Sequence, residues 1–120
     1  MCRGLSMSTP SKQKGSKAER DVVKYLNEQG YTYADRRLAG DTFDKGDISG
    51  INGVCFEVKN RQKMDLAGWI EELKVEIENS KSKTGVVVHK RKGKTDVGEW
   101  YATMPFSLWV ELIKLAGWKE

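Results

Sequence analysis

The chain of 120 residues is long enough for one compact domain and too short for a second independent core. Hydrophobic residues make up 38 % and charged residues 32 % of it, with a formal net charge of +4, which argues against global disorder. Cys2 and Cys55 lack the spacing of a disulfide framework or a zinc site, so we expect reduced thiols in a cytoplasmic protein. No apolar run reaches the roughly 18–20 residues of a membrane span, so we expect no membrane partner.

The first predicted elements are an N-terminal arm and a helix. Residues 1–15 are rich in Ser, Lys, Gly and Thr and lack apolar periodicity, which predicts a flexible basic arm ahead of a single domain at residues 16–120. Ser16-Lys17-Ala18-Glu19 has the form of a helix capping box. Apolar residues then recur at helical spacing, at Ala18, Val22, Tyr25 and Leu26. The first helix is predicted to run from this box to Gly30.

Three strands are predicted between this helix and residue 59. Residues 31–38 carry aromatic and β-compatible side chains, whereas Gly and Asp in residues 39–46 predict a loop. Short strands at residues 47–51 and 54–59 flank Asn52-Gly53. That dipeptide predicts a hairpin, because both residues tolerate the positive φ angles of a tight turn.

The second half of the chain predicts a helix, two strands and a final helix. Asp65 can cap a helix with an apolar stripe formed by Leu66, Trp69, Ile70, Leu73 and Ile77, with Glu71, Glu72, Glu76 and Glu78 largely off it. Residues 85–88 form an apolar run of the buried-strand type, and residues 100–103 predict another strand. Pro105 precedes the last helix, marked by Phe106, Trp109, Val110 and Ile113. The predicted fold is α/β, with a mixed central sheet flanked by helices in the order αβββαββα.

Charged side chains on the hairpin are the first candidates for chemistry. Side chains alternate along a strand, so Glu57 and Lys59 project from the same face, where an ordinary ion pair is the alternative. Asp47 on the preceding strand brings a second carboxylate beside Glu57, and such oxygen donors suit Mg²⁺ or Mn²⁺. A simple turn aspartate is the alternative for Asp47, with Asp41 and Asp44 as competing candidates.

Glu19 is the third acidic candidate. Helical geometry places it in the sector spanned by the apolar residues of the first helix, so it is expected to point toward the sheet. Burial of a carboxylate is costly unless a cation compensates it. The alternative is that Glu19 only completes the capping box with Ser16.

Several motifs together resemble the PD-(D/E)XK nuclease superfamily, and within it the archaeal-type Holliday junction resolvases and their phage-borne relatives. The resemblance lies in Lys14-Gly15-Ser16-Lys17-Ala18-Glu19-Arg20, Gly46-Asp47-Ile48 and Phe56-Glu57-Val58-Lys59-Asn60, and more loosely in residues 64–69 and 86–91. Gly46 stands where the family pattern has proline. The resemblance implies a restriction-endonuclease-like fold. It also implies that the protein is a magnesium-dependent endonuclease that acts in DNA recombination and repair, in the host cytoplasm if a phage encodes it.

The same resemblance implies roles for the candidate residues. Asp47 and Glu57 would bind Mg²⁺ or Mn²⁺, Glu19 would join or support that site, and Lys59 would orient the attacking water or stabilise negative charge. A salt bridge with Glu57 is the competing role of Lys59. The implied protein is a homodimer that cleaves branched DNA, and the Trp and Leu residues near the C-terminus suit a dimer interface. Cleavage of flapped, damaged or duplex DNA and a non-catalytic DNA-binding module are the alternatives.

Two stretches rich in basic residues predict contacts with DNA. Residues 1–18 and 81–94 contain no Asp or Glu, and such patches attract phosphate backbones. Solvated lysines without a ligand are the alternative. Arg36 and Arg37 are candidates only because of their position in the family pattern. The full set of candidate phosphate contacts is Lys14, Lys17, Arg20, Arg36, Arg37, Lys90, Arg91 and Lys92.

Overall fold

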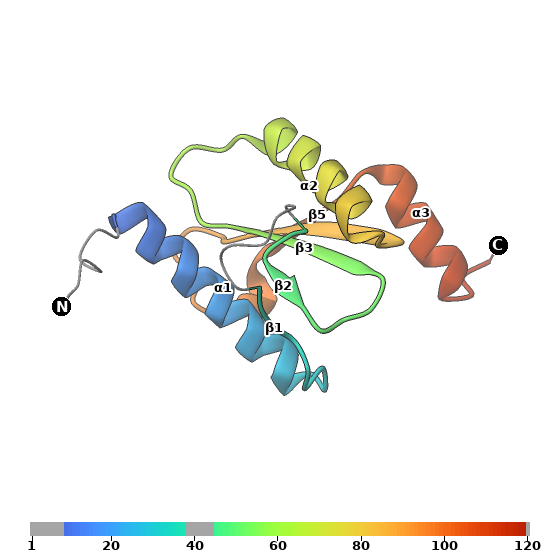
Figure 1. Ribbon diagram of the computed structural model, residues 1–120, viewed down its shortest axis with the longest axis horizontal. Helices are drawn as coiled ribbons and strands as arrows, with labels where there is room; N and C mark the ends of the chain where they lie inside the picture. Colours follow the sequence, from blue (N-terminus) through green and yellow to red (C-terminus); the bar gives the residue numbers. More distant parts are fainter. Residues whose placement is uncertain (1–8, 38–44, 120) are drawn as a thin grey trace.

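The computed structural model describes residues 9–37 and 45–119, and Figure 1 shows how their helices and strands are arranged. In chain order the elements are α1 (Pro10–Glu28), β1 (Asp35–Arg36), β2 (Ile48–Ser49), β3 (Val54–Lys59), α2 (Leu66–Ser80), β4 (Thr84–His89), the 3₁₀ helix η2 (Val97–Glu99), β5 (Tyr101–Thr103) and α3 (Phe106–Leu115). The predicted α/β class with a mixed sheet flanked by helices is confirmed, and the order differs from the predicted one only by the 3₁₀ turn.

The five strands form one sheet in the order β1-β2-β3-β4-β5. β3 and β4 are parallel and α2 connects them, whereas the other neighbouring strands are antiparallel. The predicted antiparallel pairing around Asn52-Gly53 is confirmed, because Ile48 pairs with Phe56, but the first strand covers only Ile48–Ser49 instead of residues 47–51. Gly53 has the expected positive φ, at 84°, whereas Asn52 does not. The parallel pair places Lys59 beside His89 at the end of the sheet where both strands terminate.

Two clusters of buried apolar residues lie on opposite faces of the sheet, beneath α1 and α2, which Figure 1 shows on either side of it. The cluster beneath α1 contains Ala18, Val22, Ala34, Ile48, Phe56, Val58 and Trp100. The cluster beneath α2 contains Cys55, Trp69, Leu73 and Val87. Because side chains alternate along β3, Glu57 and Lys59 share the α2 face with Cys55, while Val58 faces α1.

The predicted boundary between arm and first helix is wrong. α1 begins at Pro10, and the hydroxyl of Thr9 caps it by accepting a hydrogen bond from the Lys12 N–H at 3.2 Å. Proline suits the first helical position because its fixed φ matches the helix and it has no N–H to leave unpaired. Ser16 therefore lies inside the helix and is not its cap. Residues 1–8 of the predicted arm lie outside the described residues.

The predicted strand at residues 31–38 is much shorter: within its described part, residues 31–37, only Asp35–Arg36 form a strand, and the Ala34 N–H closes a turn onto the Tyr31 carbonyl. Most of the predicted loop at residues 39–46, including Asp41 and Asp44, lies outside the described residues. Asp65 caps α2 as predicted, its carboxylate accepting from the Gly68 N–H at 3.2 Å.

The prediction that Glu76 lies off the buried stripe of α2 is wrong. Its side chain is only 1 % exposed and faces the sheet together with Trp69 and Leu73. Gly85 allows α2 to approach β4 closely, because a Cβ at that position would come within 2.8 Å of the Ile77 side chain. Glu76 is thus held against the sheet by the tight packing of its helix.

α3 presents an apolar face that the rest of the described chain leaves uncovered. None of its residues is buried, and Phe106 and Trp109 stack on each other with ring centroids 6.0 Å apart. Leu112 and Leu115 are also exposed, as is Trp118 just beyond the helix. Within residues 9–37 and 45–119, no helix is both long and apolar enough to cross a membrane.

Candidate active site

The structure brings Glu19, Asp47, Glu57 and Lys59 together in the lining of one cleft of about 610 Å³. Glu19 comes from α1, Asp47 precedes β2, and Glu57 and Lys59 come from β3. Residues 10–16 of α1 and the start of the connection after β3 form the remaining walls, with contributions from Ser11, Lys12, Gly15, Ser16, Asn60 and Arg61. Residues 40 positions apart in the chain thus share one concave surface at the end of the sheet.

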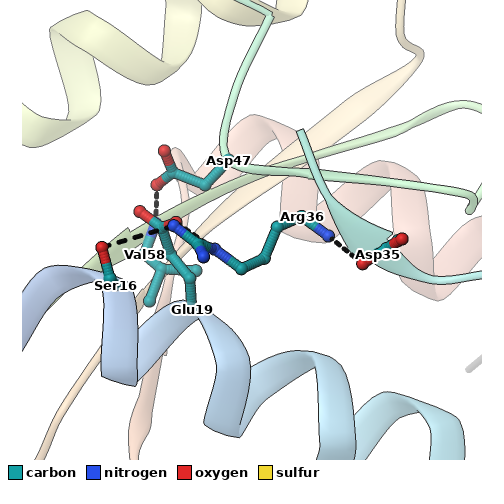
Figure 2. Close-up of polar contacts among 6 residues, drawn as sticks. All are labelled: Ser16, Glu19, Asp35, Arg36, Asp47 and Val58. Carbon is teal, nitrogen blue, oxygen red and sulfur yellow. Dashed lines mark hydrogen bonds and ion pairs between the residues drawn. The ribbon is translucent and has the colours of Figure 1, made fainter. Parts of the chain in front are cut away.

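Backbone contacts with β3 hold Asp47 in place. Its N–H donates to the Phe56 carbonyl at 2.8 Å. Its Oδ2 accepts from the Val58 N–H at 2.7 Å, as Figure 2 shows. Gly46 directs the chain into this position with a φ of 95°, and a Cβ there would lie 2.7 Å from the Phe56 carbonyl oxygen. Proline, whose ring fixes φ near about −65°, cannot adopt this conformation. Glycine at this position therefore follows from the path of the backbone.

The carboxyl groups of Asp47 and Glu57 are strongly perturbed by their surroundings. Burial is the main cause that raises the pKa of Asp47 to about 8, and the hydrogen bond and charge of Glu57 add to it. Burial likewise raises the pKa of Glu57 to about 8, with a further contribution from the hydrogen bond and charge of Glu76. Such groups stay neutral near pH 7 unless a nearby cation stabilises their charged forms.

One oxygen of Glu57 marks this region as suited to a cation. Its Oε2 is buried and has no hydrogen-bond partner within the described part of the chain, and the residue is only 4 % exposed. The carboxylates of Glu57, Glu72 and Glu76 offer oxygen atoms that all lie within 4.8 Å of one another. This largely buried acidic cluster could hold a metal ion, and its oxygen donors fit the hard divalent cations.

Glu19 is positioned by a basic side chain from β1. Its Oε1 accepts from Arg36 Nε at 2.9 Å, and the same guanidinium donates to the Ser16 hydroxyl at 3.3 Å (Figure 2). Burial raises the pKa of Glu19, the charge of Asp47 raises it further, and Arg36 opposes both. The alternative that Glu19 only completes a capping box does not hold, because Ser16 is not the cap.

The structure pairs Lys59 with Glu72 and not with Glu57. Lys59 is 8 % exposed, and its Nζ lies 3.2 and 3.3 Å from the two carboxylate oxygens of Glu72. Lys59 also lines a neighbouring cleft of about 690 Å³ with Arg61, Trp69 and the loop that follows β3. Its ammonium is therefore fixed where the two clefts adjoin.

Sequence reasoning missed the two acids that α2 contributes. Glu76 follows Trp69 by seven residues and Leu73 by three, which is the spacing of a buried helix face and was the available signal. Glu72 lies one turn before Glu76, so both side chains can reach the same region of β3. Glu71 and Glu78 are exposed, as predicted for residues off the stripe.

The predicted DNA contacts fall into distinct environments. Arg36 is occupied by Glu19, and Lys17 pairs with Asp21 at 2.8 Å. Arg37 lines a separate hollow near the start of β3, away from the cleft. The Lys90 ammonium lies 5.8 Å from the centroid of the Trp100 ring, and Lys17 and Lys90 border one pocket between α1 and the segment after β4. The remaining predicted contacts are exposed: Lys14, Arg20, Arg91 and Lys92.

Fold alone does not define function, because one fold can host many unrelated activities. Comparisons of the chain with protein-family models, with curated proteins and with solved structures found no match. What the protein does is therefore inferred from the chemistry of the cleft.

Proposed function

We propose that the protein is a metal-dependent endodeoxyribonuclease that hydrolyses phosphodiester bonds in branched DNA, with a restriction-endonuclease-like fold. The observation that carries the proposal is the gathering of Glu19, Asp47, Glu57 and Lys59 in the lining of one cleft. A structural ion pair needs no such set, whereas phosphodiester hydrolysis needs both a cation site and a nearby positive group.

Asp47 and Glu57 would hold Mg²⁺ or Mn²⁺, with Glu19 beside them as a third acidic group. A divalent cation supplies positive charge to the phosphoryl oxygens and makes water more acidic. The Val58 N–H fixes one oxygen of Asp47, and Arg36 restrains Glu19. The protein thus holds the acidic groups in a set arrangement before substrate arrives, which reduces reorganisation during the reaction.

Lys59 would stabilise negative charge on the phosphate as it develops. The ion pair with Glu72 holds its ammonium at the edge of the cleft, and the residue as a whole is only 8 % exposed. A positive group in such a water-poor position acts more strongly than it would in bulk water. Lys59 is therefore the group we assign to charge stabilisation or orientation of the attacking water.

DNA is the proposed substrate because basic side chains border the acidic floor. Lys12 and Arg61 line the cleft itself, and exposed Arg91 and Lys92 follow β4, whose end lies beside Lys59. Phosphate contacts of this kind position a backbone without reading its sequence. The preference for branched DNA and the homodimer rest on the family resemblance, and the uncovered apolar face of α3 offers a surface for the second copy.

Cleavage of three synthetic substrates tests the proposal and its alternatives together. A four-way junction, a flap and a linear duplex are incubated with Mg²⁺ or with EDTA. We expect Mg²⁺-dependent incision of the junction well above that of the duplex. Equal incision of all three would leave a general nuclease in place of a junction resolvase, and tight binding without incision in Mg²⁺ or Mn²⁺ would support a non-catalytic DNA-binding module.

A further inference from the structure

We propose that Glu57, Glu72 and Glu76 form a second divalent-cation site on the α2 side of β3, which shares Glu57 with the site at Asp47. The inference rests on the proposed function only in taking Asp47 and Glu57 as the first cation site. Glu57 would then bridge two cations, one on each side of its carboxylate. The second site is one that the family resemblance does not predict, because two of its three residues come from α2.

The topology of the fold brings these three carboxylates together. Alternation along β3 turns Glu57 toward α2, and Glu72 and Glu76 lie one helical turn apart on the facing helix. Their oxygen atoms all lie within 4.8 Å of one another. Glu57 and Glu76 are 4 % and 1 % exposed, so the two share a dry environment. Solvent therefore screens the charges of Glu57 and Glu76 poorly, whereas Glu72 lies at the exposed side of the group.

The unpartnered oxygen of Glu57 is a second and independent observation. Oε2 is buried without a hydrogen-bond partner in the described part of the chain, although buried polar atoms are nearly always satisfied. Among the described residues, one ammonium is hydrogen-bonded to the cluster, that of Lys59 through Glu72. A divalent cation at this position would stabilise the charged forms of the buried carboxyl groups. Donor sets made only of carboxylate oxygens favour Mg²⁺, Mn²⁺ or Ca²⁺ over zinc.

Lys59 is the competing occupant of this position. Both oxygens of Glu72 lie within 3.3 Å of its ammonium, so Lys59 could itself be the cation that the cluster requires. Glu72 has a side chain that is 48 % exposed, and it can turn one oxygen toward a metal while the other keeps its contact with Lys59. The two possibilities differ in the number of divalent ions that the protein binds.

Counting bound Mn²⁺ by electron paramagnetic resonance in the absence of DNA decides between them. We expect two ions per wild-type chain, one in Asp47→Asn, one in Glu76→Gln and none bound tightly in Glu57→Gln. Glu78→Gln, which changes an exposed acid on the same helix, should still bind two. Glu72→Gln serves as a second variant if Glu76→Gln does not fold, and it should weaken the second ion about tenfold or more without affecting the first.

A single ion in the wild-type chain, or two ions in a folded Glu72→Gln variant with unchanged affinities, would overturn the second site. Loss of both ions in Asp47→Asn would also overturn it, since Asp47 is not among its ligands. These results are distinguishable from failure of the proposed function. Two bound ions without cleavage of any DNA would remove the nuclease and leave the second site, whereas Mg²⁺-dependent cleavage with one bound ion would do the reverse.

Discussion

The stability of the metal-free protein should fall as the pH rises from about 5 to 8. Asp47 and Glu57 have pKa values of about 8 in the folded protein, against ordinary values of 3.8 and 4.5. Between these limits the folded protein keeps protons that the unfolded chain has released, so the free energy of unfolding decreases with pH. The stabilisation is fully present below the ordinary pKa values and is lost as the pH passes through about 8.

The size of the effect follows from the number of extra protons. Each one changes the free energy of unfolding by about 1.4 kcal/mol per pH unit. If the pair of acids retains one proton between pH 5 and 7, the loss is about 3 kcal/mol, or roughly 10 °C in melting temperature for a domain of this size. His89 acts in the opposite direction, because burial lowers its pKa and stability then rises as the pH approaches 6.5. A comparison with Glu57→Gln cancels that contribution.

Urea unfolding in EDTA at pH 5, 6, 7 and 8 measures the effect in the wild type, in Glu57→Gln and in the control Glu78→Gln. We expect the wild type and the control to lose stability in parallel and Glu57→Gln to show a flatter slope. Added Mg²⁺ should restore stability most at pH 8, where a larger share of the acidic groups is ionised than at the lower pH values. A parallel slope in Glu57→Gln, or a wild type that gains stability relative to that variant as the pH rises, would refute the assignment of the retained proton to this site.

Three further predictions concern the backbone, the basic patch and the apolar helix. Gly46→Ala should lower the free energy of unfolding by about 2–4 kcal/mol, because it combines a positive φ with a contact to the Phe56 carbonyl. Gly93→Ala, at a φ of 79° with open space around it, should cost only about 1 kcal/mol in the same denaturation assay. The predicted phosphate contacts after β4 are Lys90, Arg91 and Lys92. Neutralising all three should weaken the binding of every DNA and flatten the plot of log affinity against log salt concentration. An unchanged slope in anisotropy titrations would contradict this. Trp109→Glu, on the exposed face of α3, should convert a dimer into a monomer by light scattering, and a wild type that is already monomeric would remove the homodimer from the account.

Local signals in the sequence were sufficient for much of the fold. The Asn52-Gly53 turn, the Asp65 cap and the start of a helix after Pro105 depend on backbone preferences within a few residues, and all three occur in the structure. The sequence does not predict the start of α1 correctly, because Ser16 fits a capping box as well as Thr9 and Pro10 fit a helix start. Residues 10–15 lack apolar periodicity and are rich in Lys and Ser, yet they form the first turns of the helix whose later turns pack on the sheet.

The sequence predicts the part of the candidate site that lies on the hairpin, but not the part that α2 contributes. Glu57 and Lys59 share a strand face by simple alternation, and Asp47 is brought beside them by the adjacent hairpin. Glu72 and Glu76 depend on how α2 is rotated over β3, which is set by the close packing at Gly85. Charge alone suggested that such acids face solvent. In the structure, long-range packing buries Glu76 against the sheet and places the Lys59 ammonium beside Glu72.

The most direct test of the central claim is single-turnover cleavage of a four-way junction by Asp47→Asn, with junction binding measured on the same preparation. Asparagine keeps the size of the side chain but removes the charge that would hold a cation. The account predicts a loss of cleavage of about 100-fold or more, with binding and the thermal melt retained and with full activity in Glu78→Gln. Cleavage by a folded Asp47→Asn variant within a few-fold of the wild-type rate would contradict it.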